Sequence, residues 1–423
     1  MKILFLAPDT NLSYEMRGGA GTHMRASVTE LRKLGHDVIL AVGGDLIEKK
    51  NTNLDNFDNQ NGFYFKSFLK KVIPAEAKKT VLDYNIQRKN KSVTFKTEQI
   101  IKSNPNIDVI YERSGYGYDT GMVLSEKYNI PRCMETDVIM LDLKKSYTSK
   151  LFNNFFYRWL EKKKYHSANS ITVQSEYSVS LCKKYWNLNH DRVFNKDLGI
   201  NKMNLELNPM LDVNKKHALK DKIVVGFVGY FMGYQNIPIL LEAAKKFENI
   251  SNDIIFLLVG GGGVFNDLQK KVEKDNIKNV IFTGLVDKQD VANYYDRIDL
   301  AVIPDCAYHM YPVKFLEYSL FKLPTITPNY KVFERFYLNT SKFKEMTFES
   351  KNIDSLVQKL KYSIDNIEKL KEEVNYTYDY VIENHKWERC AKLIENALIE
   401  TLKFLKKNEY PPHQQENRNQ RWC

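Results

Sequence analysis

Strands alternate with amphipathic helices in both halves of this sequence. The alternation predicts an α/β protein with two Rossmann-like domains that face each other across a cleft. The 423 residues are too many for one ordinary hydrophobic core, so two domains are expected. Each half opens on a short apolar run of the kind that buried parallel strands show, KILFLAP (2–8) and IVVGFVG (223–229).

The first domain is expected over residues 1–200. After the strand at 2–8, a helix over MRASVTELRKLG (24–35) and a second strand at 37–44 complete a βαβ opening. Gly18 and Gly19 lie between that first strand and the helix. A Gly-Gly pair there lets backbone N–H groups approach an anion closely, or it forms a flexible loop that needs no ligand.

Three later runs of the first half read as strands: IDVIYERSG (107–115), IPRCMETD (130–137) and SITVQSE (170–176). The first would place Glu112 and Arg113 at its functional edge, and the second ends in Glu135 and Asp137. The E-x-D spacing of that pair suits a metal site, although a capping or loop role is the more frequent one. The pattern assigns no elements between residues 45 and 105.

A polar stretch at 201–222 is expected to link the domains, and the second domain should span residues 223–383. An amphipathic helix at 384–407 and a polar tail at 408–423 would follow. The strand over DIIFLLVGGGG (253–263) ends in a glycine run that includes Gly261 and Gly262. These glycines can bring backbone amides to a phosphate, or they make a tight turn. The other elements predicted in this domain are helices at 237–247, 265–275 and 290–298 and strands at 279–286 and 300–304.

The next segment, PVKFLEYSLFKLPTIT, predicts a helix that begins after Pro312 and ends before a strand. Its N-terminus would lie at the carboxyl edge of the parallel sheet, where such folds bind ligands and where a helix start attracts anions. Lys314 could reach a phosphate there, and Glu317 could accept hydrogen bonds from ribose hydroxyls. Alternatively, this is a core helix with a solvated lysine and glutamate.

The distribution of charge and the lack of certain motifs indicate which partners this protein is expected to have. The net charge is +11, and residues 1–200 hold 31 lysines and arginines against 22 acidic residues. This imbalance suits an anionic membrane surface, and no nucleic-acid-binding motif is present. The segment 144–164 carries aromatic residues among cations, which fits an interfacial helix or a core-facing helix with a basic outer face. No metal motif or signal peptide is seen, so we expect a metal-free cytoplasmic protein, peripheral at the inner face of the membrane.

Several segments together resemble the GT-B glycosyltransferases of glycosyltransferase family 4. They are RGGAGTH, IDVIYERSG, IPRCMETD, ANSITVQSEYS, VGFVGY, LLVGGGG, VIFTGLVDKQDVANYYDRIDLAVIPD and PVKFLEYSLFKLPTI. The resemblance covers most of residues 1–400. It implies transfer of a sugar from a nucleotide-diphosphate sugar, which is a co-substrate, usually with retention at the anomeric carbon and without metal. The acceptor would be a sugar, a lipid-linked molecule or a small molecule, in polysaccharide, glycolipid or secondary-metabolite synthesis.

The resemblance also implies roles for single residues. Glu317 takes the position of the ribose-binding glutamate, while Gly18, Gly19 and the helix start near Lys314 face the diphosphate. His309 stands where the family has a second glutamate, and Arg113 stands where a histidine is common. With Glu135, these two are the candidate catalytic residues. The departures leave two alternatives: a catalytically silent nucleotide-sugar-binding partner of an active transferase, and a GT-B nucleotide-sugar epimerase.

Overall fold

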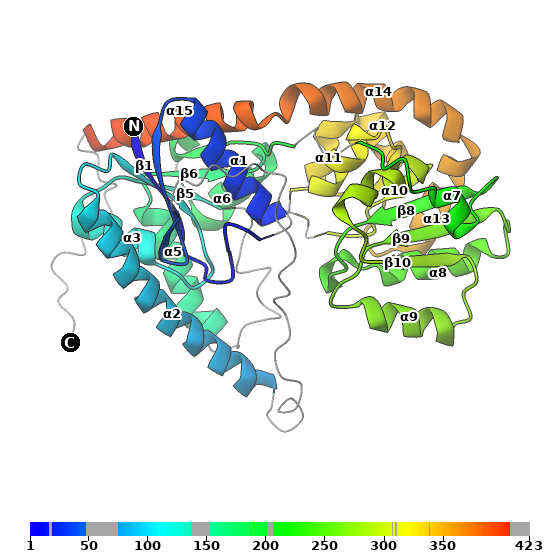
Figure 1. Ribbon diagram of the computed structural model, residues 1–423, viewed down its shortest axis with the longest axis horizontal. Coiled ribbons are helices and arrows are strands. Elements are labelled where there is room, and N and C mark those ends of the chain that lie inside the picture. Colours follow the sequence, from blue (N-terminus) through cyan, green and yellow to red (C-terminus); the bar gives the residue numbers. More distant parts are fainter. Residues whose placement is uncertain are drawn as a thin grey trace. The chain divides into compact units, whose positions relative to one another are not determined.

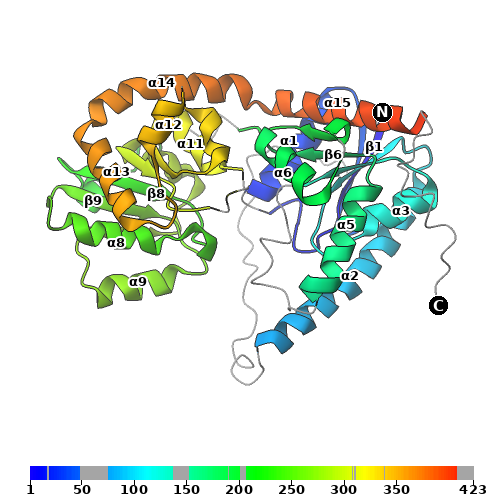
Figure 2. The same ribbon diagram turned by 180° about the vertical axis from the view of Figure 1, so that it is seen from behind.

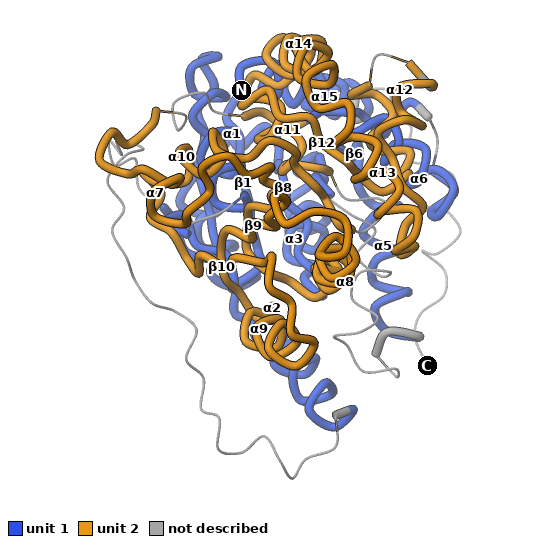
Figure 3. Tube along the Cα trace, turned by 90° about the vertical axis from the view of Figure 1, so that its right-hand side faces the viewer, with its two compact units in different colours: residues 1–197, 387–423 blue, residues 198–386 orange. Residues whose placement is uncertain are grey.

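The computed structural model describes residues 1–16, 19–47, 75–136, 152–188, 190–200, 206–306, 308, 311–337 and 339–406. The chain forms two compact units (Figure 3), one of residues 1–197 and 387–423 and the other of residues 198–386. Both units are α/β, and each is built on a largely parallel sheet, as the sequence predicted.

Unit 1 contains a seven-stranded sheet in the order β3-β2-β1-β4-β5-β6-β7, in which only the β2–β3 pair is antiparallel. Its strands are β1 (Lys2–Ala7), β2 (Asp37–Val42), β3 (Asp45–Ile47), β4 (Val109–Arg113), β5 (Arg132–Glu135), β6 (Ser170–Val173) and β7 (Val193–Asn195). The chain leaves β1 toward β2 on one side, and β4 lies on the other side of β1. The β1–β4 boundary is therefore the topological switch point of this sheet, where ligands of open α/β sheets bind.

The helices of unit 1 cover both faces of this sheet (Figure 1). They are α1 (Gly19–Lys33), α2 (Ala75–Ser103), α3 (Thr120–Tyr128), the π-helix η2 (Phe152–Tyr157), α5 (Arg158–Ser167), α6 (Glu176–Trp186), the 3₁₀-helix η3 (His190–Arg192) and α15 (Trp387–Lys406). Leu4 and Leu6 of β1 share a core cluster with Ile100 of α2 and Leu124 of α3. Helix α15 packs on α1 and on strands β4 to β6.

Unit 2 contains a six-stranded, all-parallel sheet in the order β10-β9-β8-β11-β12-β13. Its strands are β8 (Ile223–Val228), β9 (Ile254–Val259), β10 (Val280–Gly284), β11 (Leu300–Val302), β12 (Thr325–Pro328) and β13 (Thr347–Phe348). Its α-helices are α7 (Val213–His217), α8 (Pro238–Phe247), α9 (Phe265–Lys274), α10 (Val291–Arg297), α11 (Val313–Leu320), α12 (Thr340–Met346), α13 (Ile353–Asp365) and α14 (Ile367–Asn384). Short 3₁₀-helices are η5 (Gly233–Gln235), η6 (Lys288–Asp290) and η7 (Lys331–Phe336). The switch point lies between β8 and β11.

Three features differ from the sequence-based expectations or were left open by them. Helix α1 begins at Gly19 rather than at Met24, because Gly21 lets the carbonyl of Met16 and the guanidinium of Arg25 pack closely on its first turn. The C-terminal helix α15 belongs to unit 1, although it follows unit 2 in sequence. The described part of the expected linker, residues 206–222, contains α7 and belongs to unit 2.

Candidate functional site

The switch point of unit 2 is where β8 ends, and it brings Gly229 against Lys314. The Gly229 N–H donates to the Val259 carbonyl at 2.9 Å, and its φ of +152° is a backbone conformation that favours glycine. A Cβ atom at residue 229 would lie 2.3 Å from Lys314 Nζ. The space beside this glycine is therefore filled by the lysine ammonium.

Lys314 is the second residue of α11, so its charge lies at the start of a helix of eight residues. Its Nζ lies 5.5 Å from the centroid of the Phe227 ring. Within the described residues it has neither a hydrogen-bond acceptor nor an ion-pair partner. Burial lowers the pKa of Lys314, and the nearby Glu317 carboxylate partly opposes that shift. A partly desolvated ammonium at a helix N-terminus is a strong phosphate-binding arrangement.

Glu317 lies one turn further along α11 and is held by a hydrogen bond from a distant residue. The Tyr295 hydroxyl donates to Glu317 Oε2 at 2.9 Å. Burial, and then the neighbouring carboxylate, raises the pKa of Tyr295 well above its usual value, so this hydroxyl remains a donor. The Tyr295 ring stacks on Phe321 with centroids 4.7 Å apart. The carboxylate of Glu317 is therefore fixed by a rigid aromatic neighbour.

The glycine run after β9 packs on the chain that follows β8. A Cβ at Gly260 would lie 2.0 Å from the Gly229 carbonyl oxygen, and one at Gly262 would lie 2.6 Å from the Phe231 nitrogen. The Phe231 N–H donates to the Gly261 carbonyl at 2.7 Å. Close backbone packing therefore requires Gly260 and Gly262, whereas phosphate contacts by Gly261 and Gly262 stay a prediction. His309, the predicted catalytic residue of this unit, lies outside the described residues.

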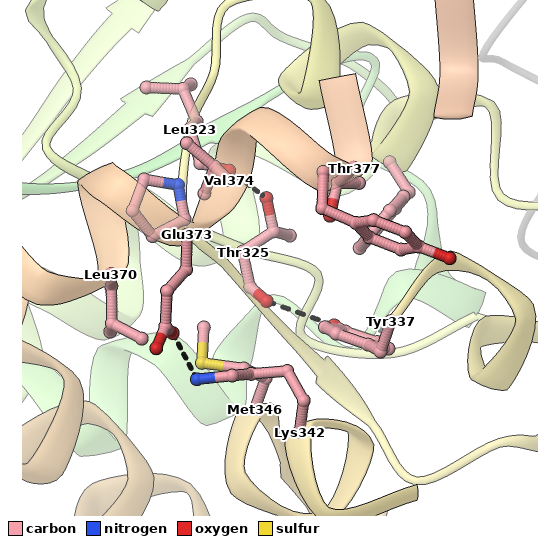
Figure 4. A pocket seen from close by; sticks show the side chains of 12 residues that line it. Leu323, Thr325, Tyr337, Lys342, Met346, Leu370, Glu373, Val374 and Thr377 are labelled. Carbon is pink, nitrogen blue, oxygen red and sulfur yellow. Dashed lines mark hydrogen bonds and ion pairs between the residues drawn. The ribbon is translucent and has the colours of Figure 1, made fainter. Parts of the chain in front are cut away.

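A cavity of about 160 Å³ lies on another side of α11 (Figure 4), and Phe315 of that helix lines it. The polar groups around it bond one another: the Tyr337 hydroxyl donates to the Thr325 carbonyl at 3.1 Å, and Lys342 forms an ion pair with Glu373. Such a cavity offers no converging charges to a diphosphate. We therefore place the candidate site at the β8–β11 switch point instead.

In unit 1, the switch point brings Arg113 to the start of α1. The Arg113 guanidinium, at the end of β4, donates to the Ala20 carbonyl at 2.9 Å. A Cβ at Gly19 would meet no atom within 4 Å, so the backbone at the start of α1 is open to a close approach. The structure therefore places Arg113 beside the helix start that contains Gly19, and the sequence had singled out both residues. Gly18 lies outside the described residues.

Glu135, the third candidate catalytic residue, is fully buried at the end of β5 and surrounded by partners. The Tyr111 hydroxyl donates to Glu135 Oε2 at 2.6 Å, and Lys196 Nζ and His23 Nε2 each lie 3.4 Å from Oε1. Lys196 Nζ also lies 2.8 Å from His23 Nε2. Buried charges of this kind need paired neighbours. Sequence reasoning did not single out His23 or Lys196, although both follow strands whose carboxyl ends meet at this edge.

Two further expectations about carboxylates are corrected or left open by the structure. Glu112, expected at the functional edge of its strand, forms a buried ion pair with Arg132 at 2.5 Å and is therefore structural. Asp137, the partner of Glu135 in the possible metal-binding pair, lies outside the described residues. Within the described part of the chain, no three histidine, cysteine or acidic side chains gather as a group of metal ligands.

The aromatic stripe expected over residues 144–164 is described from residue 152 onward, and its side chains divide between two environments. Tyr157 and Leu160 are buried in a core cluster, whereas Phe155 and Trp159 are exposed. The segment therefore serves the core on one side and presents aromatic rings on the other. None of the helices that the structure describes combines the length and the apolar character needed to cross a bilayer.

Comparison with known proteins agrees with this architecture. Residues 211–397 match the family model of glycosyl transferases group 1. A segment of 166 residues, 38% of this chain, is 25% identical to TuaH of Bacillus subtilis (strain 168), which is assigned as a teichuronic acid biosynthesis glycosyltransferase. That match spans 41% of the length of TuaH.

Solved structures of similar fold cover nearly the whole chain. Sucrose-phosphate synthase from Thermosynechococcus elongatus aligns with a TM-score of 0.69 at 15% identity, over 94% of this chain and 98% of that one. Anabaena HepE in complex with UDP aligns with a TM-score of 0.68 at 13% identity, over 94% and 99%. WaaG, a glycosyltransferase involved in lipopolysaccharide biosynthesis, aligns with a TM-score of 0.62 at 13% identity, over the same shares. The chain therefore has the GT-B fold of these solved structures, and its residues 211–397 match glycosyl transferases group 1.

Proposed function

We propose that this protein transfers a sugar from a nucleotide-diphosphate sugar to an acceptor, with retention at the anomeric carbon. The observation that carries the proposal is the switch point of unit 2, where Lys314 and the tyrosine-held Glu317 lie on the first turns of α11. The match to glycosyl transferases group 1 supports it, because it includes both residues. Solved structures of HepE with UDP and with UDP-glucose support this donor class.

The donor would bind at the carboxyl edge of the unit 2 sheet. Its diphosphate would accept hydrogen bonds from the Lys314 backbone N–H at the start of α11, where Val313, Phe315 and Leu316 already donate to backbone carbonyls, and from the Lys314 ammonium. Its ribose hydroxyls would donate to Glu317, whose orientation Tyr295 fixes. As the glycosidic bond breaks, negative charge grows on the diphosphate, and donors already in place stabilise it without reorganisation. Because these cationic and dipolar groups can serve the leaving group, we propose that no metal ion is needed.

The acceptor-side residues belong to unit 1 in this proposal. Arg113 and the open backbone at Gly19 offer a cation and N–H donors at one sheet edge. Glu135 is enclosed by Tyr111, Lys196 and His23, so we propose that it orients these neighbours and thereby the first turns of α1. His309 would contact the sugar or a donor phosphate.

The relatives support a proposal for the class of acceptor. The similarity to TuaH, a teichuronic acid biosynthesis glycosyltransferase, favours an acceptor in polysaccharide synthesis, and the HepE complex with UDP-glucose favours transfer of a hexose. The excess of cations in residues 1–200 adds a peripheral contact with anionic membrane, the surface on which lipid-linked acceptors are presented. We propose a cytoplasmic protein, peripheral at the inner face of the membrane.

One observation favours a second candidate function. His309 stands where the family has a glutamate, which would suit a partner that binds a nucleotide-sugar without turning it over. An epimerase of this fold would instead turn the donor over without glycosylating an acceptor. A transferase would yield a glycosylated acceptor, an epimerase would convert the donor without glycosylating an acceptor, and a silent partner would yield no product.

A panel of nucleotide-sugars tests the proposal in two stages. A ligand that binds only the native state raises the midpoint of thermal unfolding, so a thermal-shift screen identifies the donor. Turnover of that donor is then followed by release of free nucleotide, and NMR of the product reads the anomeric configuration. A glycosylated acceptor with the donor's configuration supports the proposal. Binding without turnover supports the silent partner, and no binding by any nucleotide-sugar refutes both.

A further inference from the structure

Helix α2 presents apolar and cationic side chains on its outer face. Val81, Tyr84, Arg88, Lys91 and Phe95 recur at spacings of three and four, so they form one stripe along the helix. Val81, Tyr84 and Phe95 are 59%, 66% and 65% exposed. The opposite face is buried and includes Asp83, Asn90, Val93 and Thr97. We name this outer stripe the α2 face.

The charge on this surface has a single sign. Between residues 81 and 96, α2 carries four cations and one acid, Asp83, which is fully buried and accepts a hydrogen bond from the Tyr157 hydroxyl at 3.2 Å. Lys96 pairs with Asp45 at the far end. Arg88 and Lys91 have no ion-pair partner within the described residues. Between residues 81 and 96 the α2 face is therefore cationic and apolar, and this described stretch of the helix has no exposed carboxylate.

A second surface of the same kind adjoins α2. Figure 2 shows α5 beside α2, and the Tyr157–Asp83 hydrogen bond joins the end of η2 to α2. Phe155 and Trp159 are 73% and 52% exposed there, and Lys163 Nζ lies 5.7 Å from the centroid of the Trp159 ring. Glu161, the acid of α5, is buried in an ion pair with Lys164. Two neighbouring helices therefore each expose aromatic rings among cations.

We propose that the α2 face docks this protein on an anionic lipid surface. Aromatic rings and arginine or lysine at a helical spacing match the two layers of a membrane interface, the acyl boundary and the anionic headgroups. Nucleic acid would use the cations and the rings, but the exposed aliphatic Val81 and Leu82 would gain nothing from it. The stripe from Val81 to Phe95 is about 21 Å long at about 1.5 Å per residue, so it would lie along the surface. The choice of lipid rests on the proposed function, whose acceptor includes lipid-linked molecules.

Vesicle co-sedimentation tests the proposal with the full chain. We expect binding to vesicles of phosphatidylcholine mixed with phosphatidylglycerol that weakens as salt rises, and little binding to phosphatidylcholine alone. Arg88→Gln with Lys91→Gln should lower the partition coefficient about thirtyfold, because each cation contributes about fivefold. Tyr84→Ala with Phe95→Ala should also weaken binding, and the size of this loss should depend little on salt concentration, because the removed contribution is apolar. The matched control is Lys270→Gln with Lys274→Gln on the exposed side of α9, which removes the same charge and should leave binding nearly unchanged.

Several results would overturn lipid binding by the α2 face. All six changed side chains are exposed, and thermal unfolding checks that the variants fold. Equal binding to neutral and anionic vesicles, no binding at low salt, or equal losses in the α2 and α9 variants would overturn it. Binding of a single-stranded oligonucleotide that depends on Arg88 and Lys91, without vesicle binding, would assign the α2 face to nucleic acid instead. Donor binding, measured without vesicles, reports separately on the proposed function.

Discussion

Replacing Gly229 by alanine should weaken nucleotide binding, because the new methyl group would take the place of the Lys314 ammonium. The Cβ atom would lie 2.3 Å from Lys314 Nζ and 2.6 Å from its Cε. Since the lysine end is flexible, it would swing away rather than unfold the domain. The positive charge would then leave the start of α11, where we propose that the diphosphate binds.

The expected size of the effect follows from the interaction that is lost. A hydrogen bond from a charged group contributes about 1.5–3 kcal/mol, and about 1.4 kcal/mol corresponds to a factor of ten, so affinity for a nucleoside diphosphate should fall about ten- to hundredfold. The φ of +152° at Gly229 adds backbone strain. This strain should lower the free energy of unfolding by about 1–3 kcal/mol, the cost of a backbone conformation that is nearly confined to glycine.

Titration calorimetry with a nucleoside diphosphate measures the affinity, and denaturant unfolding measures the stability. The matched control is Gly35→Ala, because Gly35 has a φ of +87° and a Cβ there would meet no atom within 4 Å. This variant should lose a similar stability and keep its affinity. A Gly229→Ala, Lys314→Ala double variant should bind no more weakly than Lys314→Ala alone. Wild-type affinity in folded Gly229→Ala, or an equal loss in Gly35→Ala, would refute the reasoning.

Three further predictions concern the same site. Glu317→Ala should weaken nucleoside diphosphate binding at least about tenfold, and Tyr295→Phe only about fivefold, since it removes one neutral donor that orients the carboxylate; calorimetry showing no change for folded Glu317→Ala would remove that residue from the site. Because burial lowers the pKa of Lys314, its charge and the nucleotide affinity should be present below that lowered pKa and be lost as pH rises through it, whereas Lys314→Arg should keep a flat alkaline profile. Turnover should survive excess EDTA, and a loss that Mg²⁺ or Mn²⁺ restores would contradict metal independence.

The sequence by itself determined most elements of unit 2 and their order. From β8 to β12 the predicted strands and helices agree with the structure to within a few residues, because parallel strands buried on both faces are continuously apolar and their helices are amphipathic. The same local signal placed Lys314 and Glu317 near a helix start at a sheet edge. The local signal predicted no elements between residues 45 and 105. Helix α2 lies in this range, and its outer face mixes apolar and charged residues, which hides the usual helical periodicity.

Tertiary structure decided the contacts between residues distant in the chain. The pairs Gly229–Lys314 and Tyr295–Glu317, and the enclosure of Glu135 by His23 and Lys196, depend on which strands are neighbours in a sheet. Strand order places β8 beside β11 and gathers the ends of β4 to β7 at one edge. A local pattern of apolar residues carries no information about that order. The assignment of α15 to unit 1 has the same cause, because its apolar face is complemented by α1 and the unit 1 sheet, which precede it by hundreds of residues.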